Sequence, residues 1–425
     1  MDALRKITPV STPLRGSIRP PGSKSQTNRA VVCAALGDGR SVLTDALDSD
    51  DTRVMVKALQ ALGIAIDADW PRAKLVVDGC AGVLPTRNAT LDLDGSGTSI
   101  RFLTALVATG TGLITLDGNT RMRERPIGEL ADALRQCGTE IETQSGFPPV
   151  VVRANRLCGK KVSLRGDISS QYLSALMLAA PAAQTGMEFI IEGPQVSQPY
   201  IAMTCAVMES FGVVVEHDTE RVFRVAPQKY KSRTYRIEPD ASAASYFWAA
   251  AAITGGRVQV EGLNRESLQG DIAFCDCLER MGCRLEYEAT GTTVVGGPLS
   301  GIDVDMADIS DTVQTLAVVA LFAKGPTTIR GVAHIRHKES DRIGDLAREL
   351  RKLGAIIEET EDGLCIYPQP MQGAKIKTYN DHRMAMSLAV AGLRVPGIQI
   401  FDPDCTAKTY PNFFQDLDQL AIADR

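Results

Sequence analysis

Polar and charged residues gather in short segments that are typical of helix starts. The segment PGSKS at 21–25 places Lys24 between two hydroxyl side chains, and Arg29 follows about one helical turn later. It resembles half of a P-loop, but the full pattern G-x-x-x-x-G-K-[ST] does not occur in the chain, which disfavours a nucleotide cradle. Because a helix start presents unpaired N–H groups and partial positive charge, the segment is typical of a site for a smaller anion.

Three more segments of the first half have the same character. DGSGT at 94–98 would let backbone amides approach a ligand closely, although a plain tight turn explains its glycines equally well. Ser169, Ser170 and Gln171 offer three polar side chains that suit a phosphate or that cap a helix. In RMRERP at 121–126, a strand-like alternation would place three guanidinium groups on one face, where they repel one another unless an anion or a carboxylate intervenes. We therefore predict a binding role for at least one of these arginines.

In the second half, the segment HIRHKESDR leads into a predicted helix that we expect Ser340 or Asp341 to cap. Lys338 and Arg342 lie about one turn apart and flank Glu339, an arrangement that a surface salt-bridge cluster would also explain.

Two more cations occur later in the second half: Arg383 in the helix start DHR, and Lys408 in the segment that follows it. Together with the earlier segments they predict a site for anionic small molecules that carry at least two acidic groups. Two carboxylates, Asp311 and Glu339, are available there for proton transfer. The pattern therefore favours an enzyme over a simple binding protein.

The elements that must position these residues repeat along the chain. A helix-ending phrase occurs five times, as ALQALGIAI, ALRQCGTEI, VMESFGVVV, CLERMGCRL and ELRKLGAII, with a spacing of about 72 residues between its glycines. A second phrase interleaves with it six times: a polar cap and then a helix rich in Ala, Leu and Val. We expect these six helices to be buried, with Ser, Asp or Asn at their N-caps.

One complete unit is readable at 162–225 as strand, helix, strand, helix, strand, strand. Six such units account for the chain, and the last helix would complete its unit with the N-terminal strands. Both termini then belong to one half, so the boundary is crossed twice, at two proline-containing extended stretches. The predicted domains are 20–236, on the side of the phosphate-binding segments, and 1–19 plus 237–425, which holds both termini and the two carboxylates.

Composition excludes several classes of protein. The net charge of -5 and the absence of a basic block argue against nucleic acid or an anionic membrane as the main partner. The longest apolar stretches fall short of the roughly 18 residues that span a bilayer, and the N-terminus lacks the apolar region of a secretory signal. Ten cysteines without a C-x-x-C pattern are typical of reduced thiols in a cytoplasmic protein, and we expect no metal site.

At this point the sequence resembles a known family. PGSKSQTNRA, GTSIRF, RMRERPIG, DISSQYLSALM, HKESDRI, YNDHRMAMSLA and DPDCTAKTYP closely resemble the motifs of the 5-enolpyruvylshikimate-3-phosphate synthase family, over about residues 7–414. The resemblance implies a monomeric α/β enzyme, a two-domain inside-out α/β barrel of six βαβαββ repeats with its active site in the interdomain cleft.

The resemblance also implies a reaction. The family transfers the enolpyruvyl group of phosphoenolpyruvate to the 5-hydroxyl of shikimate 3-phosphate, through a tetrahedral ketal intermediate and with release of phosphate. This step leads to chorismate and the aromatic amino acids, and the resemblance implies no cofactor. Binding of both substrates is expected to close the cleft and to exclude water.

Position by position, the resemblance assigns roles to residues of this chain. The implied catalytic residues are Asp311 as proton acceptor from the 5-hydroxyl, Glu339 near the methylene carbon, and Lys24. The implied ligands of shikimate 3-phosphate are Lys24, Ser25, Arg29, Ser169, Ser170, Gln171, Ser197, Tyr200, Asp311 and Lys338. The implied ligands of phosphoenolpyruvate are Lys24, Gly97, Arg125, Gln171, Arg342, Arg383 and Lys408.

The chain differs from many relatives at two places: Gly95-Ser96 stands where Asn-Ala is common, and His334 where Asn is common. Gly97 lacks the methyl group that alanine carries in members resistant to glyphosate, an inhibitor of the phosphoenolpyruvate site, so we expect sensitivity.

Two alternatives stay open at the level of sequence. The sister enzyme that transfers enolpyruvate to UDP-N-acetylglucosamine shares the repeats, but it is recognised by Lys-Asn where this chain has Lys24-Ser25, and by a loop cysteine in a Gly-rich segment, and neither feature occurs here. A non-catalytic anion-binding homologue would be free to lose the two carboxylates, which this chain keeps.

Overall fold

The computed structural model describes residues 3–422 and divides them into two compact units. The continuous unit is Gly22–Ile237, and the split unit joins residues 3–21 to residues 238–422. The divisions fall one or two residues from the boundaries that the repeat pattern predicts. Each unit has a hydrophobic core of its own.

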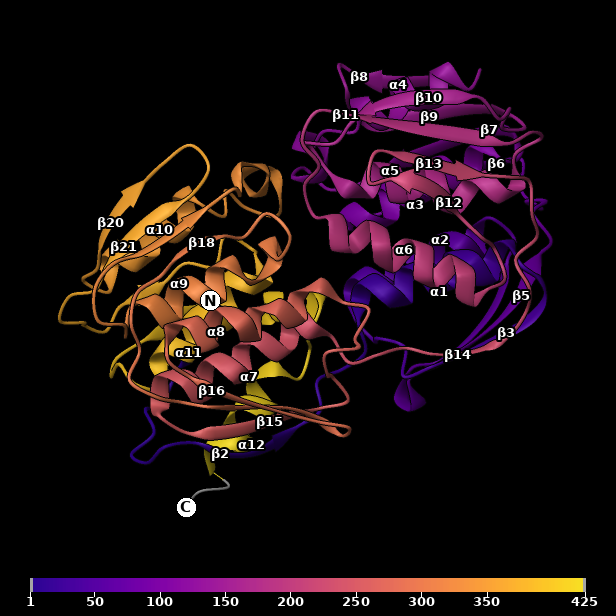
Figure 1. The fold of residues 1–425 in the computed structure, drawn as a ribbon. Coiled ribbons are helices and arrows are strands. Elements are labelled where there is room, and N and C mark those ends of the chain that lie inside the picture. Colours follow the sequence, from indigo (N-terminus) through magenta and orange to yellow (C-terminus); the bar gives the residue numbers. More distant parts are fainter. Residues whose placement is uncertain (1–2, 423–425) are drawn as a thin grey trace. The chain divides into compact units, whose positions relative to one another are not determined.

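The continuous unit contains three four-stranded sheets and six α-helices, drawn from indigo to magenta in Figure 1. Its first repeat comprises α1 (Lys24–Leu36), β3 (Asp38–Thr44), α2 (Asp50–Ala61), β4 (Ala65–Asp69), β5 (Lys74–Cys80) and the returning strand β14 (Thr234–Arg236). The second comprises β6 (Asn88–Asp92), α3 (Gly97–Ala108), β7 (Thr111–Asp117), α4 (Gly128–Gln136), β8 (Glu140–Gln144) and β9 (Phe147–Asn155). The third comprises β10 (Lys161–Arg165), α5 (Ser170–Ala179), β11 (Met187–Glu192), α6 (Gln198–Ser210), β12 (Glu216–Thr219) and β13 (Val222–Val225).

The split unit repeats the same plan. Its first repeat comprises β2 (Arg15–Ile18), α7 (Ala241–Thr254), β15 (Arg257–Glu261), α8 (Phe274–Met281), β16 (Arg284–Glu288) and β17 (Gly291–Val295). The next comprises β18 (Asp303–Asp305), α9 (Val313–Ala320), β19 (Thr327–Arg330), α10 (Gly344–Lys352), β20 (Ile356–Glu359) and β21 (Leu364–Tyr367). The last comprises β22 (Lys375–Ile376), α11 (His382–Gly392), β23 (Gln399–Phe401), α12 (Phe413–Ile422) and the N-terminal strand β1 (Leu4–Lys6).

Each full sheet has the same register of directions. In every four-stranded sheet one pair of neighbouring strands is parallel and the other two pairs are antiparallel, as in the order β6-β7-β9-β8. In two sheets the parallel partner comes from far along the chain: β14 pairs with β3, and β2 pairs with β15. The βαβαββ unit predicted at 162–225 is confirmed. The α/β class is confirmed as well, but the six sheets remain separate in residues 3–422, so they form no closed barrel of strands.

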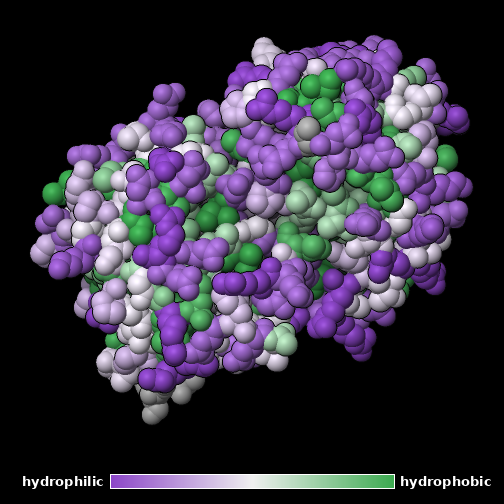
Figure 2. All heavy atoms as spheres, viewed as in Figure 1, coloured by the Kyte–Doolittle hydropathy of each residue, from purple (hydrophilic) through white to green (hydrophobic). Residues whose placement is uncertain are grey.

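The crossover helices are almost wholly buried, because their sides face sheets and one another. Every residue of α3 and of α7 is buried, which explains why these segments are apolar nearly all round. Side chains of Ser23, Ser96, Ser169, Asp240 and Asp381 accept a hydrogen bond from the first turn of α1, α3, α5, α7 and α11. Such a cap stabilises a helix by about 1 kcal/mol and fixes where it starts. On the face seen in Figure 2, hydrophobic residues appear only as small separate patches.

Four sequence expectations fail in detail. The strand β2 pairs with β15 of the fourth repeat, so only β1 completes the sixth. The segment RMRERP contains a 3-10 turn, Met122–Glu124, and no strand. Helix α9 follows a 3-10 turn, Ser310–Thr312, and has no side-chain cap. Helix α10 begins at Gly344, with Ile343 at its N-cap, although Asp341 still accepts hydrogen bonds from its first amides.

Candidate functional site

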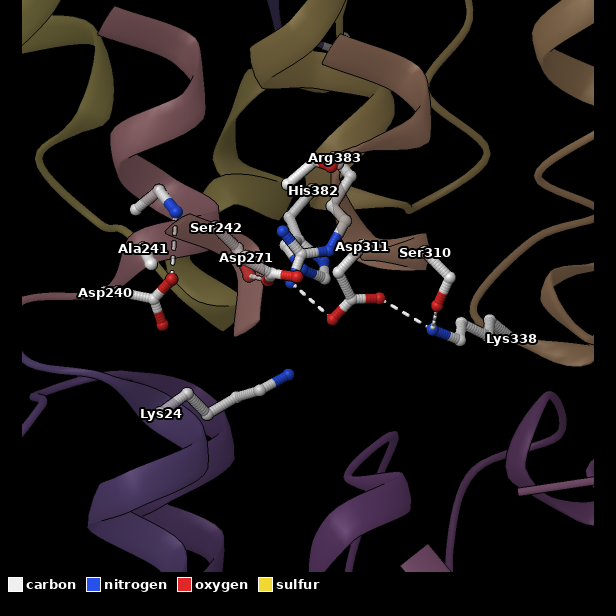
Figure 3. Close-up of polar contacts among 12 residues, drawn as sticks. Lys24, Asp240, Ala241, Ser242, Asp271, Ser310, Asp311, Lys338, His382 and Arg383 are labelled. Atoms are coloured by element: carbon white, nitrogen blue, oxygen red, sulfur yellow. Dashed lines mark hydrogen bonds and ion pairs between the residues drawn. The ribbon is translucent and has the colours of Figure 1, made fainter. Parts of the chain in front are cut away.

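The candidate residues of the split unit converge on Asp311, which lies in the 3-10 turn before α9. Its carboxylate accepts hydrogen bonds from Lys338 Nζ at 2.7 Å, Arg342 Nη1 at 3.0 Å and Arg383 Nη2 at 2.8 Å. Figure 3 shows Lys338 also reaching the hydroxyl of Ser310, at 3.3 Å. Three cations from two segments, 334–342 and the start of α11, therefore hold one carboxylate in place.

Arg342 joins Asp311 to two more carboxylates. Its Nε donates to Asp381 at 2.7 Å and its Nη2 donates to Glu339 at 2.8 Å, and the side chain is 2% exposed. Burial opposes the charge of this guanidinium, but the negative charges of Asp381, Glu339 and Asp311 raise the pKa of Arg342. The guanidinium is permanently charged, and its orientation is fixed by three carboxylates.

Asp381 ties this network to the backbone, because it is also the N-cap of α11. It is fully buried and accepts hydrogen bonds from the Arg383 amide at 2.9 Å and the Ser340 hydroxyl at 3.0 Å. Glu339, the second predicted carboxylate, lies 3.8 Å from Lys408 Nζ. The structure thus brings together all the candidate residues that the sequence places in this unit.

Lys338 and His334 are both perturbed by burial. Burial lowers the pKa of Lys338, against the attraction of Asp311. Burial, and next the charge of Lys338, lowers the pKa of His334 to about 3, so this imidazole is neutral near pH 7. Its Nε2 is buried and has no hydrogen-bond partner among the described residues. His334 therefore presents a neutral nitrogen beside the charged network.

In the continuous unit, Lys24 is the first residue of α1 and forms an ion pair with Asp51 of α2. The distance from Lys24 Nζ to Asp51 Oδ2 is 3.3 Å, and both side chains are largely buried. Because α2 begins at Asp50 under a capping box of Ser49 and Thr52, its first turn fixes Asp51 opposite the lysine.

Arg29 is buried, and its guanidinium meets only neutral acceptors among the described residues. It donates to Thr204 Oγ1 at 2.8 Å, to the Tyr200 carbonyl at 3.2 Å and to the Ser25 carbonyl at 3.0 Å. Burial lowers the pKa of Arg29 to about 10, which still leaves it charged at neutral pH. The arginine joins the start of α1 to α6 and adds positive charge that no carboxylate offsets.

Gly97 and Arg125 lie against each other. A Cβ atom on Gly97, the first residue of α3, would lie 2.6 Å from Arg125 Nη2, so a methyl group there would make the end of the Arg125 side chain shift. The other two arginines of the segment are exposed and paired, Arg121 with Glu124 and Arg123 with Asp117. Arg125, by contrast, is buried and lies against Gly97. A binding role for at least one of the three arginines stays a prediction.

The starts of α5 and α6 hold the remaining candidates. Ser169 caps α5, and the side chain of Gln171 accepts a hydrogen bond from Arg101 Nη1 at 2.6 Å and donates to Thr98 Oγ1 at 3.3 Å. Ser197, before α6, has a left-handed backbone with φ of 57° and is nearly buried. Gln171 therefore joins the starts of α3 and α5.

Sequence reasoning gave no role to two buried participants, Asp51 and Arg101, and treated Asp381 only as part of a capped helix start. Asp51 and Asp381 lie at helix starts, and the sequence pattern of a helix start indicates such positions. Arg101 lies within an apolar helix, where only its charge was unusual.

A cavity of about 760 Å³ opens elsewhere in the continuous unit, near the C-terminal ends of α1 and α3. None of its lining residues is a predicted site residue, so the cavity does not coincide with the candidate site.

In residues 3–422, no group of three or more His, Cys, Asp or Glu side chains is arranged to hold a metal ion. Over the same residues, none of the helices combines the length and the hydropathy that a membrane span requires.

Comparisons with known proteins point to one family. The model of the family described as EPSP synthase (3-phosphoshikimate 1-carboxyvinyltransferase) matches residues 9–417. The chain is 48% identical over 419 residues to the 3-phosphoshikimate 1-carboxyvinyltransferase of Nostoc punctiforme, covering 97% of this chain and 98% of that one. It is 45% identical over 421 residues to the enzyme of that name from Serratia proteamaculans, covering 98% of both.

Solved structures agree with these matches. An EPSP synthase from Acinetobacter baumannii has a TM-score of 0.83 and 26% identity over 98% of both chains. The enolpyruvyl transferase NikO from Streptomyces tendae has a TM-score of 0.79 at 20% identity, covering 98% of this chain and 97% of that one, which is a likeness of fold alone.

Proposed function

The chain belongs to the EPSP synthase family, and on that premise we propose that it transfers the enolpyruvyl group of phosphoenolpyruvate to the 5-hydroxyl of 3-phosphoshikimate. The products are 5-enolpyruvylshikimate 3-phosphate and phosphate, a step toward chorismate and the aromatic amino acids. The observation that carries the proposal is the network around Arg342, which holds Asp311 and Glu339 on one guanidinium. Two carboxylates so fixed suit a reaction that needs both a base and an acid.

Cations and polar groups of both units would bind the two anionic substrates. Residues proposed for 3-phosphoshikimate are Lys24, Ser25, Arg29, Ser169, Ser170, Gln171, Ser197, Tyr200, Asp311 and Lys338. Residues proposed for phosphoenolpyruvate are Lys24, Gly97, Arg125, Gln171, Arg342, Arg383 and Lys408. Arginine suits the carboxylate and phosphate of phosphoenolpyruvate, because its planar fork binds such groups in bidentate fashion.

In the addition step, Asp311 takes the proton of the 5-hydroxyl as its oxygen attacks C2 of phosphoenolpyruvate. Glu339, with Lys24, delivers a proton to C3, and the product is a tetrahedral ketal phosphate. In the elimination step, C3 returns its proton to Glu339 as the C–O bond to phosphate breaks, which leaves the enol ether. The proton that Asp311 took from the 5-hydroxyl leaves with the phosphate, so both carboxylates regain their starting forms. Lys24 stabilises the departing phosphate by its charge.

One assay tests the reaction. Phosphate release from phosphoenolpyruvate is measured with 3-phosphoshikimate or with UDP-N-acetylglucosamine as acceptor. We expect release with 3-phosphoshikimate alone. Release only with the sugar nucleotide would favour the sister activity, and no release with either would favour an anion-binding protein.

The proposal extends to the state of the protein. We expect a cytoplasmic monomer that needs no cofactor, and we expect both substrates together to make it more compact, because its ligands come from both units. Solution scattering measures this directly, and identical profiles with and without the substrates would contradict it.

A further inference from the structure

A further buried carboxylate, Asp271, lies near Asp311 and has no part in the proposed reaction. It belongs to the 3-10 turn Gly270–Ala273 before α8 and is 3% exposed. Its Oδ2 accepts a hydrogen bond from the hydroxyl of Ser242, in the first turn of α7. A buried carboxylate is costly unless other charges offset its own, so its position needs an explanation.

Groups from three neighbouring elements act on Asp271: Asp240 and Ser242 at the start of α7, Asp311 before α9, and Arg383 on α11. Burial and then the charge of Asp311 raise the pKa of Asp271 to about 6, against Ser242 and Arg383, which lower it. Figure 3 draws these side chains in one group. Asp271 and Asp311 therefore share the influence of one guanidinium.

The cations that surround Asp311 oppose its proposed role as a base, and the negative charge of Asp271 can offset part of their effect. Its carboxylate accepts hydrogen bonds from Lys338, Arg342 and Arg383 within 3.0 Å. An opposite charge at such a distance lowers the pKa of a carboxyl group by about 1–3 units, which makes it a weaker base. A like charge nearby has the opposite effect, because proton uptake then relieves repulsion.

We propose that Asp271 is a positioning residue that keeps Asp311 basic: its carboxylate engages part of the charge of Arg383 and repels the charge on Asp311. The role rests on the proposed function, since it matters only if Asp311 accepts a proton. Asp271 itself binds no substrate and moves no proton in the reaction. Ser242 supports it by donating a hydrogen bond to the charged form.

The test compares the pH dependence of kcat in the wild type and in Asp271→Asn, which keeps the size of the side chain and removes its charge. In the wild type we expect kcat to rise through an inflection near pH 6, because burial and the charge of Asp311 raise the pKa of Asp271 to about 6. In the variant we expect this inflection to vanish. The acid limb of the kcat profile should move about one pH unit lower, and the plateau value of kcat should fall by about threefold to tenfold. The KM values for both substrates should stay within about twofold, because Asp271 contacts neither.

Asp416→Asn is the matched control. Asp416 is another partly buried carboxylate of the split unit that accepts a hydroxyl hydrogen bond, from Tyr410 at 2.6 Å, and burial raises its pKa. Its replacement should leave the pH profile unchanged. Ser242→Ala supplies a second reading if Asp271→Asn does not fold: without its donor, Asp271 ionises at higher pH, so the inflection should move upward.

The outcomes separate the role of Asp271 from the proposed function of the protein. A folded Asp271→Asn enzyme with the wild-type profile would overturn the role of Asp271, and so would an unmoved inflection in Ser242→Ala. If the wild type and Asp416→Asn release no phosphate with 3-phosphoshikimate, the proposed function itself has failed.

Discussion

In the split unit the candidate cations already contact carboxylates, whereas in the continuous unit one buried cation contacts none. Arg342 and Arg383 both bind Asp311, and Arg342 binds Glu339 and Asp381 as well. Arg29, by contrast, has only hydroxyl and carbonyl acceptors among the described residues, although Lys24 of the same unit pairs with Asp51. The first arrangement holds carboxylates for proton transfer, and the second leaves positive charge for an incoming anion.

The largest expected effect comes from removing a carboxylate of the split unit. Asp311→Ala and Glu339→Ala should each lower kcat by about 10²–10⁴-fold while changing the KM values much less, because general acid–base groups act in the transition state. Steady-state kinetics with both substrates measures this. Turnover like that of the wild type in both variants would exclude these residues from the mechanism. It would also contradict the view that the split unit holds carboxylates for proton transfer.

The next effect is on stability. Asp381→Ala leaves the buried Arg342 without its shortest ion pair and removes the cap of α11, so the free energy of unfolding should fall by about 3–5 kcal/mol. Chemical denaturation measures the change. Asp117→Ala, which breaks an exposed pair with Arg123, should cost less than about 1 kcal/mol. Equal losses in the two variants would show that burial does not matter here.

A third prediction concerns the continuous unit. Gly97→Ala would force Arg125 to move, because the new Cβ would lie 2.6 Å from Nη2. We expect the KM for phosphoenolpyruvate and the inhibition constant of glyphosate to rise by about tenfold or more, with a smaller change in kcat. The wild type should be sensitive to glyphosate, and a millimolar inhibition constant for it would contradict this prediction.

The smallest effect is on the pH dependence of stability. The unfolded chain binds a proton at His334 below about pH 6.5, but the folded protein does so only near pH 3. The neutral imidazole therefore contributes stability above pH 6.5 that is lost as the pH falls toward 3. His334→Asn should flatten the fall of Tm over this range, and an unchanged slope would mean that other groups cause it.

Sequence patterns predicted the repeats well and the local geometry less well. The five repeated glycines all adopt positive φ, between 80° and 116°, which explains why the phrase tolerates only glycine there. The alternation of RMRERP predicted a strand, but Arg121 and Arg123 find carboxylates three residues later and six residues earlier, and a 3-10 turn results. The role proposed for Asp271 could not be predicted from the sequence, because it depends on Asp311, a residue 40 positions away that only folding brings near.

The N-terminal strands β1 and β2 pair with β23 and β15, far along the chain. During synthesis β2 therefore waits for more than two hundred residues before its partner exists, a delay on the order of ten to fifty seconds at ribosomal rates. The continuous unit needs no such partner and is complete once Ile237 has emerged. The order of folding on the ribosome is thus set by topology: the unit that holds the uncompensated cation forms first, and the unit that holds the carboxylates forms last.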